Sequence, residues 1–136
     1  MVQPIVRDPI ILAQKSAPAS KADLQTARDL LDTLLAHRDS CVGMAANMIG
    51  VHKRIIVFCS GAEYLTMLNP EIIEKYGPYE AEEACLSLPG VRKTKRWRKI
   101  KVRFQDTELK SATKSFSDFT AQIIQHEIDH CSGILV

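Results

Sequence analysis

Apolar residues recur at helical spacing over residues 21–37. The stripe has members three or four positions apart, Leu24, Ala27, Leu30, Leu31, Leu34 and Leu35. This period places them on one face of a helix, and we assign that face to the core. Ser20 with Asp23 three residues later is typical of a helix start, because each side chain can satisfy a free backbone N–H group of the first turn.

The centre of the chain changes to the shorter patterns of strands. Residues 54–59 form an apolar run, and residues 64–69 form another that we expect Pro70 to stop. Residues 99–104 alternate basic and apolar side chains, which is typical of a strand with one buried face. Cys59 lies in the first of these runs, and we assign its side chain to the core.

Helical spacing returns over residues 119–130, in the apolar positions Ala121, Ile123, Ile124 and Ile128. Ser117 or Asp118 can cap the start of this helix, and Gly133 can end it. An N-terminal helix, several antiparallel or mixed strands and a C-terminal helix predict an α+β fold. We treat residues 1–136 as a single domain, because the chain has the length of one core and contains no linker-like stretch.

Composition narrows the class of protein. Hydrophobic residues make up 46% and charged residues 25%, as in ordinary globular proteins. No apolar run approaches the roughly 18 residues of a membrane-spanning helix, and the N-terminus lacks the pattern of a signal peptide. A net charge of +2 does not indicate a nucleic-acid partner, and we expect no direct DNA binding. The four cysteines form no C-x-x-C pair, which favours reduced thiols in a cytoplasm.

Residues 125–130 read Gln-His-Glu-Ile-Asp-His and carry the clearest chemistry of the chain. His126 and His130 are four positions apart, so on a helix both imidazoles leave the same face and can bind one metal ion. Glu127 projects beside them, where a carboxylate can take a proton from a metal-bound water. The motif therefore predicts a hydrolytic metal site.

A catalytic metal site usually has a third protein ligand and one open position. The candidates for this third ligand are Glu82, Glu83, Cys85, Asp129, Cys131 and His52. Cys131 points about 100° further round the helix than His130, so we expect it outside the site. Cys85 precedes a stretch of turn-forming residues and is the better placed thiol. We interpret Asp129 as an ion-pair partner or orienting residue and His52 as an exposed turn residue.

Three segments, in order, resemble the signature motifs of peptide deformylases. Residues 41–48 (Cys-Val-Gly-Met-Ala-Ala-Asn-Met) match the motif G-x-G-L-A-A-x-Q imperfectly. Residues 83–87 (Glu-Ala-Cys-Leu-Ser) match E-G-C-L-S with one change, and residues 125–130 match H-E-x-D-H preceded by Gln completely. The resemblance extends over residues 9–135, and three motifs in order are far more specific than one.

The resemblance implies a role for each matching residue. Cys85, His126 and His130 would bind one divalent metal ion, usually Fe²⁺ in this family, with Zn²⁺, Ni²⁺ or Co²⁺ able to replace it. Glu127 would act as general base and acid, and the backbone N–H of Leu86 would donate to the developing oxyanion. The implied function is hydrolysis of the N-formyl group from the initiator methionine of nascent polypeptides, with release of formate.

The resemblance also places the peptide. Backbone groups near Gly43 and Cys85 would pair with an extended N-formylmethionyl peptide, with Cys41 and Ala84 beside the same path. Met48 stands where the motif has a glutamine whose amide would bind the formyl oxygen, and a thioether cannot donate a hydrogen bond. Asn47 carries an amide, but neighbours on a strand point to opposite faces, so we expect no replacement of the donor.

Cys41 and Ala84 each replace a glycine of the family motifs, which is harmless only where the backbone φ is negative. The change at Met48 motivates an alternative, a deformylase-like protein that binds metal and peptide with weak or no turnover. A second alternative is a metallopeptidase, because H-E-x-x-H helices also serve protein cleavage.

A basic run surrounds Trp97 and consists of Arg92, Lys93, Lys95, Arg96, Arg98, Lys99, Lys101 and Arg103. Such charge would suit a transient contact with ribosomal RNA, where an enzyme of nascent chains works. A solvated strand face explains the same run, and we favour it because charge runs are usually solvated surface.

Overall fold

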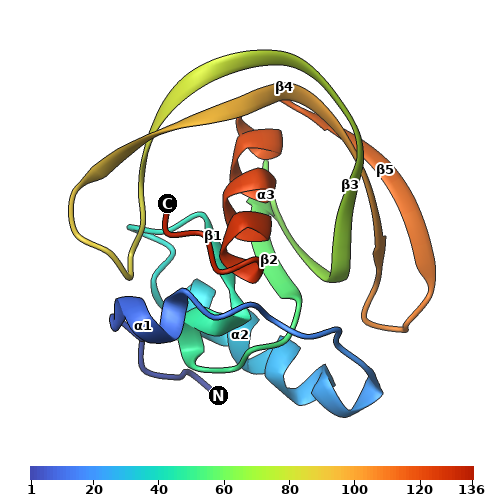
Figure 1. Ribbon diagram of the computed structural model, residues 1–136. Coiled ribbons are helices and arrows are strands. Elements are labelled where there is room, and N and C mark those ends of the chain that lie inside the picture. Colours follow the sequence, from blue (N-terminus) through green and yellow to red (C-terminus); the bar gives the residue numbers. More distant parts are fainter.

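The computed structural model describes residues 1–136 and contains one five-stranded sheet with helices on both sides (Figure 1). All strand pairs are antiparallel, in the order β1-β2-β3-β4-β5. The strands are β1 (Gly43–Ala45), β2 (Ile55–Ser60), β3 (Glu63–Ala84), β4 (Val91–Gln105) and β5 (Ser111–Ser117). The helices are α1 (Pro9–Leu12), α2 (Leu24–Ala36) and α3 (Asp118–Cys131), with 3₁₀ turns η1 (Lys21–Asp23) and η2 (Ala46–Ile49). The predicted α+β fold is confirmed, and its sheet is antiparallel rather than mixed.

Strand β2 is buried on both faces and separates two hydrophobic cores. Ile55 and Val57 point into a core shared with α1 and α2. Ile56 and Phe58 point the other way, into a core shared with α3, β4 and β5. This division follows from the period of two in a strand, which sends neighbouring side chains to opposite faces.

Strands β3 and β4 form a long hairpin that arches over α3 (Figure 1). The prediction that Pro70 stops the strand is wrong, because β3 continues to Ala84. The register between β3 and β4 shifts between Leu68 and Glu71, and Asn69 there has a positive φ of 53°. Proline has no N–H group to donate, so a bulge accommodates it without loss of the strand.

The two predicted helices are confirmed. The backbone N–H of Ser20 donates to the Asp23 carboxylate, and the chain enters α2 through the turn η1. Helix α3 begins directly after Ser117 and ends before Gly133, whose φ of 76° suits glycine and whose N–H donates to the carbonyl of His130 at 3.0 Å. No helix has the length and apolarity needed to cross a bilayer.

Two side chains differ from their predicted environments. Cys59 lies near the end of β2 and is only half-buried, because the core-facing part of the strand ends at Phe58. His52 is half-buried rather than exposed, since its Nε2 lies 2.9 Å from the carbonyl oxygen of Ile11.

Candidate active site

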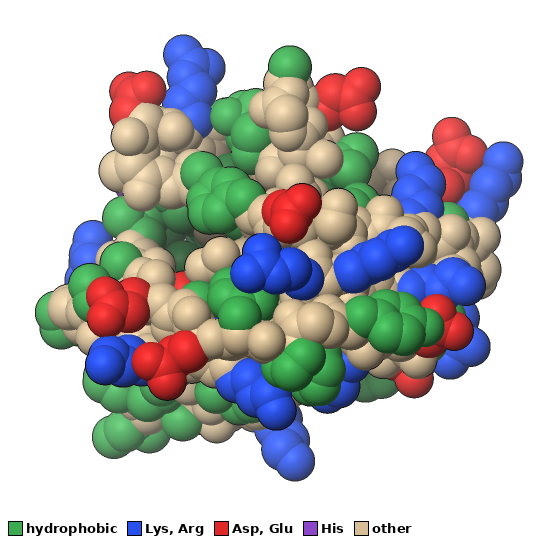
Figure 2. Space-filling model, turned by 90° about the horizontal axis from the view of Figure 1, so that it is seen from above, with side chains coloured by type: hydrophobic (Ala, Val, Ile, Leu, Met, Phe, Trp, Pro, Cys, Tyr) green, Lys and Arg blue, Asp and Glu red, His purple; other side chains and the backbone are tan.

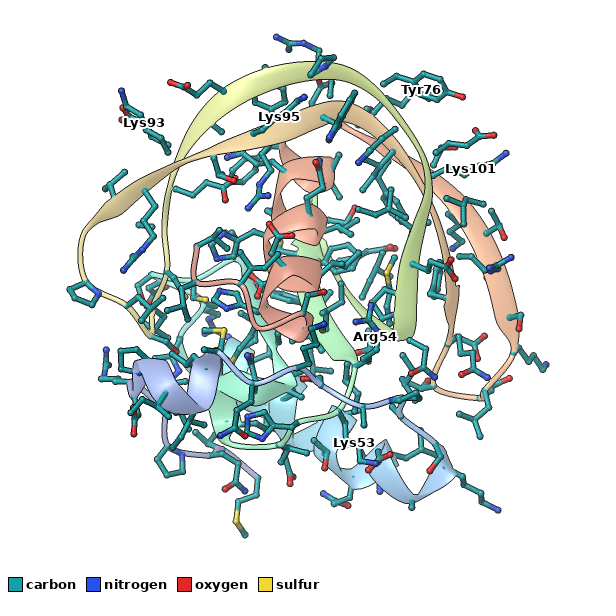
Figure 3. The ribbon with its side chains drawn as sticks, in the orientation of Figure 1. Lys53, Arg54, Tyr76, Lys93, Lys95 and Lys101 are labelled. Atoms are coloured by element: carbon teal, nitrogen blue, oxygen red, sulfur yellow. The ribbon has the colours of Figure 1, made fainter.

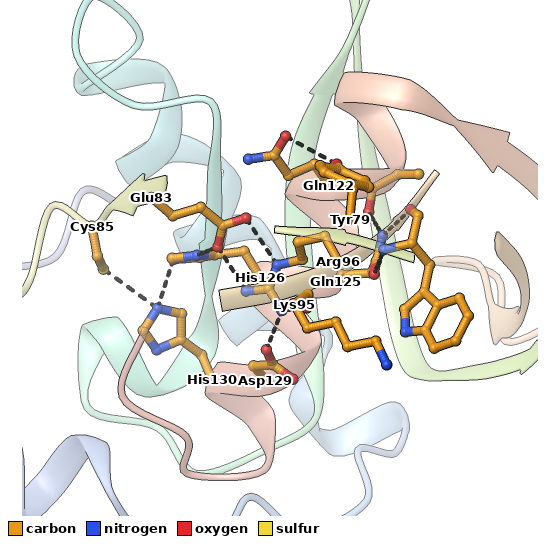
Figure 4. A network of polar contacts seen from close by, with 12 residues as sticks. Tyr79, Glu83, Cys85, Lys95, Arg96, Gln122, Gln125, His126, Asp129 and His130 are labelled. Carbon is orange, nitrogen blue, oxygen red and sulfur yellow. Dashed lines mark hydrogen bonds and ion pairs between the residues drawn. The ribbon is translucent and has the colours of Figure 1, made fainter. Parts of the chain in front are cut away.

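Three candidate ligand atoms meet between α3 and the end of β3 (Figure 4). The Sγ atom of Cys85 lies 3.4 Å from Nε2 of His130, which in turn lies 3.0 Å from Nε2 of His126. All three atoms lie within 4.8 Å of one another. The histidines come from adjacent turns of α3, and Cys85 directly follows β3. The group does not include the other candidates, Glu82, Glu83, Asp129, Cys131 and His52.

The ring nitrogen Nδ1 of His126 contacts the Glu83 carboxylate, which is itself paired with the buried Arg96 guanidinium (Figure 4). Nδ1 of His126 lies 2.8 Å from Oε1 of Glu83, and the Arg96 guanidinium donates two hydrogen bonds to the same carboxylate at 2.7 and 2.8 Å. Arg96 also donates to Asp129 at 2.6 Å, so the predicted ion-pair role of Asp129 is confirmed. A carboxylate that accepts from Nδ1–H leaves Nε2 free for a metal ion and fixes the ring orientation.

Arg96 is only 3% exposed, so its assignment to a solvated or RNA-binding face is wrong. The alternation along β4 explains the burial, because position 96 has the same parity as the core residues Ile100 and Val102. A buried guanidinium needs carboxylate partners, and Glu83 and Asp129 provide them.

The charges of the site favour a cation beside Cys85. Burial raises the pKa of Glu83, but hydrogen bonds from His126 and Arg96 outweigh it and lower that pKa to about 2. Burial lowers the pKa of His126, but the Cys85 sulfur and the Glu83 carboxylate outweigh it and raise that pKa to about 10. Burial and the charge of His126 lower the pKa of His130 to about 3. A divalent metal ion meets the same demand for positive charge, and one thiolate with two imidazoles suits iron or zinc.

Glu127 is buried beside the ligand group, with 4% of its surface exposed. Its Oε1 atom has no hydrogen-bond partner in the protein, and burial raises its pKa to about 7. Its other oxygen packs against Gly43, where a Cβ atom would lie 2.9 Å from Oε2 of Glu127 and 2.7 Å from Cγ2 of Ile123. The absence of a side chain at Gly43 therefore makes room for the carboxylate of Glu127.

Glu127 and His126 line a cavity of about 460 Å³. Its wall is formed by the start of β1 with the residues just before it, the end of β3 and α3, and it includes Val42, Phe119 and Ile123. The predicted peptide-binding residues Cys41, Gly43, Met48 and Ala84 all line it, as does Leu86. The cavity therefore brings together residues from Ser40 to Glu127, which lie 87 positions apart in the chain.

Met48 is 1% exposed and has no donor to offer the cavity. The assumption that Asn47 and Met48 lie on a strand is wrong, because both belong to the 3₁₀ turn η2. The Asn47 amide points away from the cavity and donates to the carbonyl oxygens of His130, at 2.9 Å, and Leu12, at 3.4 Å. Asn47 therefore ties η2 to the end of α3 and does not replace the missing donor.

Neither Cys41 nor Ala84 has a positive φ, so replacing the glycines of the family motifs introduces no left-handed backbone strain. The backbone N–H of Leu86 makes no hydrogen bond within the protein, and Leu86 is one of the residues that line the cavity. The carbonyl of Leu86 accepts a hydrogen bond from the Arg7 guanidinium at 2.8 Å. Arg7 had no sequence signal, because its partner lies 79 positions away.

The fold and the site together are those of a metal-dependent hydrolase. The family model described as polypeptide deformylase matches residues 2–136. The chain is 52% identical to a peptide deformylase of Clostridium beijerinckii over 136 residues, the whole of both proteins. It is 36% identical to a peptide deformylase of Thermoanaerobacter pseudethanolicus, over 92% of this chain and 80% of that one. The chain belongs to the peptide deformylase family.

Solved structures agree with this assignment. A class I type b peptide deformylase from Acinetobacter baumannii with bound Met-Ala-Ser has a TM-score of 0.89 and 31% identity, covering 99% of this chain and 97% of that one. The peptide deformylase of Thermotoga maritima has a TM-score of 0.89 and 29% identity, covering 99% and 95%. The expected fold is confirmed over nearly the whole chain.

Proposed function

We propose that the protein removes the N-formyl group from the initiator methionine of nascent polypeptides and releases formate and a free amine. Family membership supports this reaction. The observation that carries it in this chain is the buried carboxylate of Glu127. It has one oxygen without a hydrogen-bond partner and belongs to a residue that lines the cavity together with Cys85 and His126.

Cys85, His126 and His130 would hold one divalent metal ion, with Fe²⁺ as our first choice and Zn²⁺, Ni²⁺ or Co²⁺ suited to the same donors. When bound, the ion supplies Lewis-acid polarisation of the formyl carbonyl and a lowered pKa for water. Glu83 and Arg96 hold the His126 ring in place from behind. Cys85 serves as a ligand only as a thiolate, which suits a reducing cytoplasm.

Glu127 takes the proton from the attacking water and later gives it to the leaving nitrogen. A pKa of about 7, raised by burial, suits both directions of this transfer near neutral pH. The free N–H of Leu86 donates to the oxygen that becomes negative in the transition state. Met48 adds no second donor, so the reaction proceeds with less oxyanion stabilisation than the family motif provides.

The free edge of β1 receives the peptide. The N–H of Cys59 donates to the carbonyl of Val42, so the next pair in the register, Gly43 and Phe58, is a non-hydrogen-bonded pair. The N–H and C=O groups of Gly43 therefore point away from β2. An extended peptide can pair with these groups by strand addition and bring its formyl group toward Glu127.

Formate release from formyl-Met-Ala-Ser by anaerobically prepared, Fe²⁺-loaded protein tests the proposal, with Glu127→Ala as the control. We expect release that the control loses. Cleavage of an unblocked peptide instead would favour the metallopeptidase alternative. Tight metal binding without release from either peptide would favour the alternative of a binding protein with weak or no turnover.

The basic residues of β4 face acidic residues of β3 across the hairpin. The register places Lys93 opposite Glu82, Lys95 opposite Glu80 and Lys101 opposite Glu74. Lys93 and Lys101 lie on the outer side of the hairpin (Figure 3), where basic side chains alternate with acidic and hydrophobic ones (Figure 2). This neutralisation favours a solvated face over contact with ribosomal RNA.

Ribosome co-sedimentation separates the two interpretations of the basic run. We expect a variant with Arg92, Lys93 and Lys95 changed to glutamine to co-sediment as the wild type does. A clear loss of salt-dependent co-sedimentation in this variant would establish the RNA contact instead.

A further inference from the structure

The Cys41 side chain occupies a backbone acceptor of the peptide-binding edge. Its Sγ atom lies 2.9 Å from the carbonyl oxygen of Gly43 and donates a hydrogen bond to it. This carbonyl is on the free side of β1, as the register with β2 requires. No other group of the protein donates to it. One of the two lone pairs of the acceptor that strand addition needs is therefore already used.

The surroundings of Cys41 keep its thiol protonated and available as a donor. Burial, and next the negative charge of Glu127, raise the pKa of Cys41 to about 11. The residue is half-buried in the cavity wall and sits where the family motif has a glycine. A glycine has no side chain that could reach the carbonyl two residues later, so this contact depends on Cys41 itself.

We propose that Cys41 is a specificity-determining residue that competes with the incoming peptide for the Gly43 carbonyl. An incoming peptide N–H must share this oxygen with the thiol or displace the thiol, so weakly pairing chains are held off the edge strand. An edge acceptor with its own internal donor is also protected from pairing with other strands. The proposal rests on the proposed function for its natural substrate. It concerns binding and leaves the proton transfers at Glu127 unchanged.

The matched variants are Cys41→Ala and Cys41→Ser, which differ by one hydroxyl group at nearly the same volume. Cys41→Ala removes the donor, and we expect the KM for formyl-Met-Ala-Ser to fall about three- to tenfold, the range of one neutral hydrogen bond. Cys41→Ser keeps a donor, and a hydroxyl donates more strongly than a thiol, so its KM stays at or above the wild-type value. In both variants we expect the change in KM to exceed any change in kcat, because Cys41 contacts the peptide path and not the reacting atoms. If Cys41 only supported the fold, its substitutions would not lower KM in the alanine variant while leaving it unchanged or higher in the serine variant.

Two readouts do not depend on turnover. The Kd of Met-Ala-Ser, measured by calorimetry on Zn²⁺-loaded protein, should follow the same order, with Cys41→Ala binding most tightly. In infrared difference spectra, peptide binding should shift an S–H stretching band that Cys41→Ala lacks. Thermal unfolding confirms that each variant is folded. Equal Kd values for the alanine and serine variants, or an unshifted S–H band, would overturn the proposal. Absence of formate release from the wild type, with the Kd order intact, would instead count against the proposed function alone.

Discussion

Replacing Gly43 with alanine tests whether this position exists to make room for Glu127. The added Cβ atom would lie 2.7 Å from Cγ2 of Ile123 and 2.9 Å from Oε2 of Glu127, both well inside van der Waals contact. The φ of Gly43 is not positive, so alanine brings no backbone strain there and the effect is purely steric. Relief of both overlaps requires a movement of several tenths of an ångström by α3, by β1 or by the carboxylate.

The expected magnitudes follow from this overlap. Overpacking of this kind costs about 1–3 kcal/mol of the free energy of unfolding. A displacement of about 1 Å at a reacting group costs about a hundredfold in rate. We therefore expect Gly43→Ala to lower kcat for formyl-Met-Ala-Ser by one to two orders of magnitude and to lower the denaturation midpoint modestly.

A double-mutant cycle separates the two overlaps. Ile123→Ala removes Cγ2 and relieves only the apolar overlap, so the double variant should regain stability relative to the sum of the single changes. It should not regain activity, because the contact with Glu127 remains. A Gly43→Ala enzyme with kcat within threefold of the wild type would refute the argument. Full recovery of activity by Ile123→Ala would show that Ile123, and not Glu127, is the group displaced.

Three further predictions concern the chemistry of the site. Met48→Gln adds an oxyanion donor and should raise kcat/KM about 10²-fold, the value of one such donor. Met48→Leu should give no gain. Equal kcat/KM values for the two variants would show that the missing donor does not limit the rate. Glu83→Gln removes the negative charge that pairs with Arg96 and supports His126. It should weaken metal binding about 10- to 100-fold in a chelator competition assay, and unchanged affinity would contradict the role of Glu83. Removal of the metal by a chelator should lower the Tm of the wild type but not that of Cys85→Ala. The reason is that a metal ion bound only by the folded protein stabilises the folded state by mass action. An equal decrease in both proteins would show that the cation binds elsewhere.

Local periodicity was enough to predict several parts of the molecule. The leucine stripe of α2 and the apolar positions of α3 repeat within a few residues, so no distant contact is needed to recognise them. The spacing of His126 and His130 is likewise local, since one turn of helix fixes their relation. The resemblance of three short motifs placed Cys85 in the same group as these histidines, which spacing alone left open among several candidates.

Only the tertiary structure decided the features that depend on partners far along the chain. The path of β3 through Pro70 needed the bulge against β4, which a local signal for a strand end cannot reveal. Arg96 looked like one more surface charge, and its burial depends on Glu83 and Asp129 meeting it from another strand and from α3.

The cavity wall also combines features that the sequence predicts with features that only distant contacts decide. Sequence alone predicted that Met48 lacks a donor, because that property belongs to the side chain itself. It could not predict that the Asn47 amide would turn toward the carbonyl of His130, since Asn47 lies in a 3₁₀ turn that packs against α3. Nor could it reveal the contact of Cys41 with Gly43, which depends on how the chain enters β1. Residue types determined which ligands, bases and donors this protein has, whereas packing between distant segments determined which of these groups meet at the site and which groups they contact.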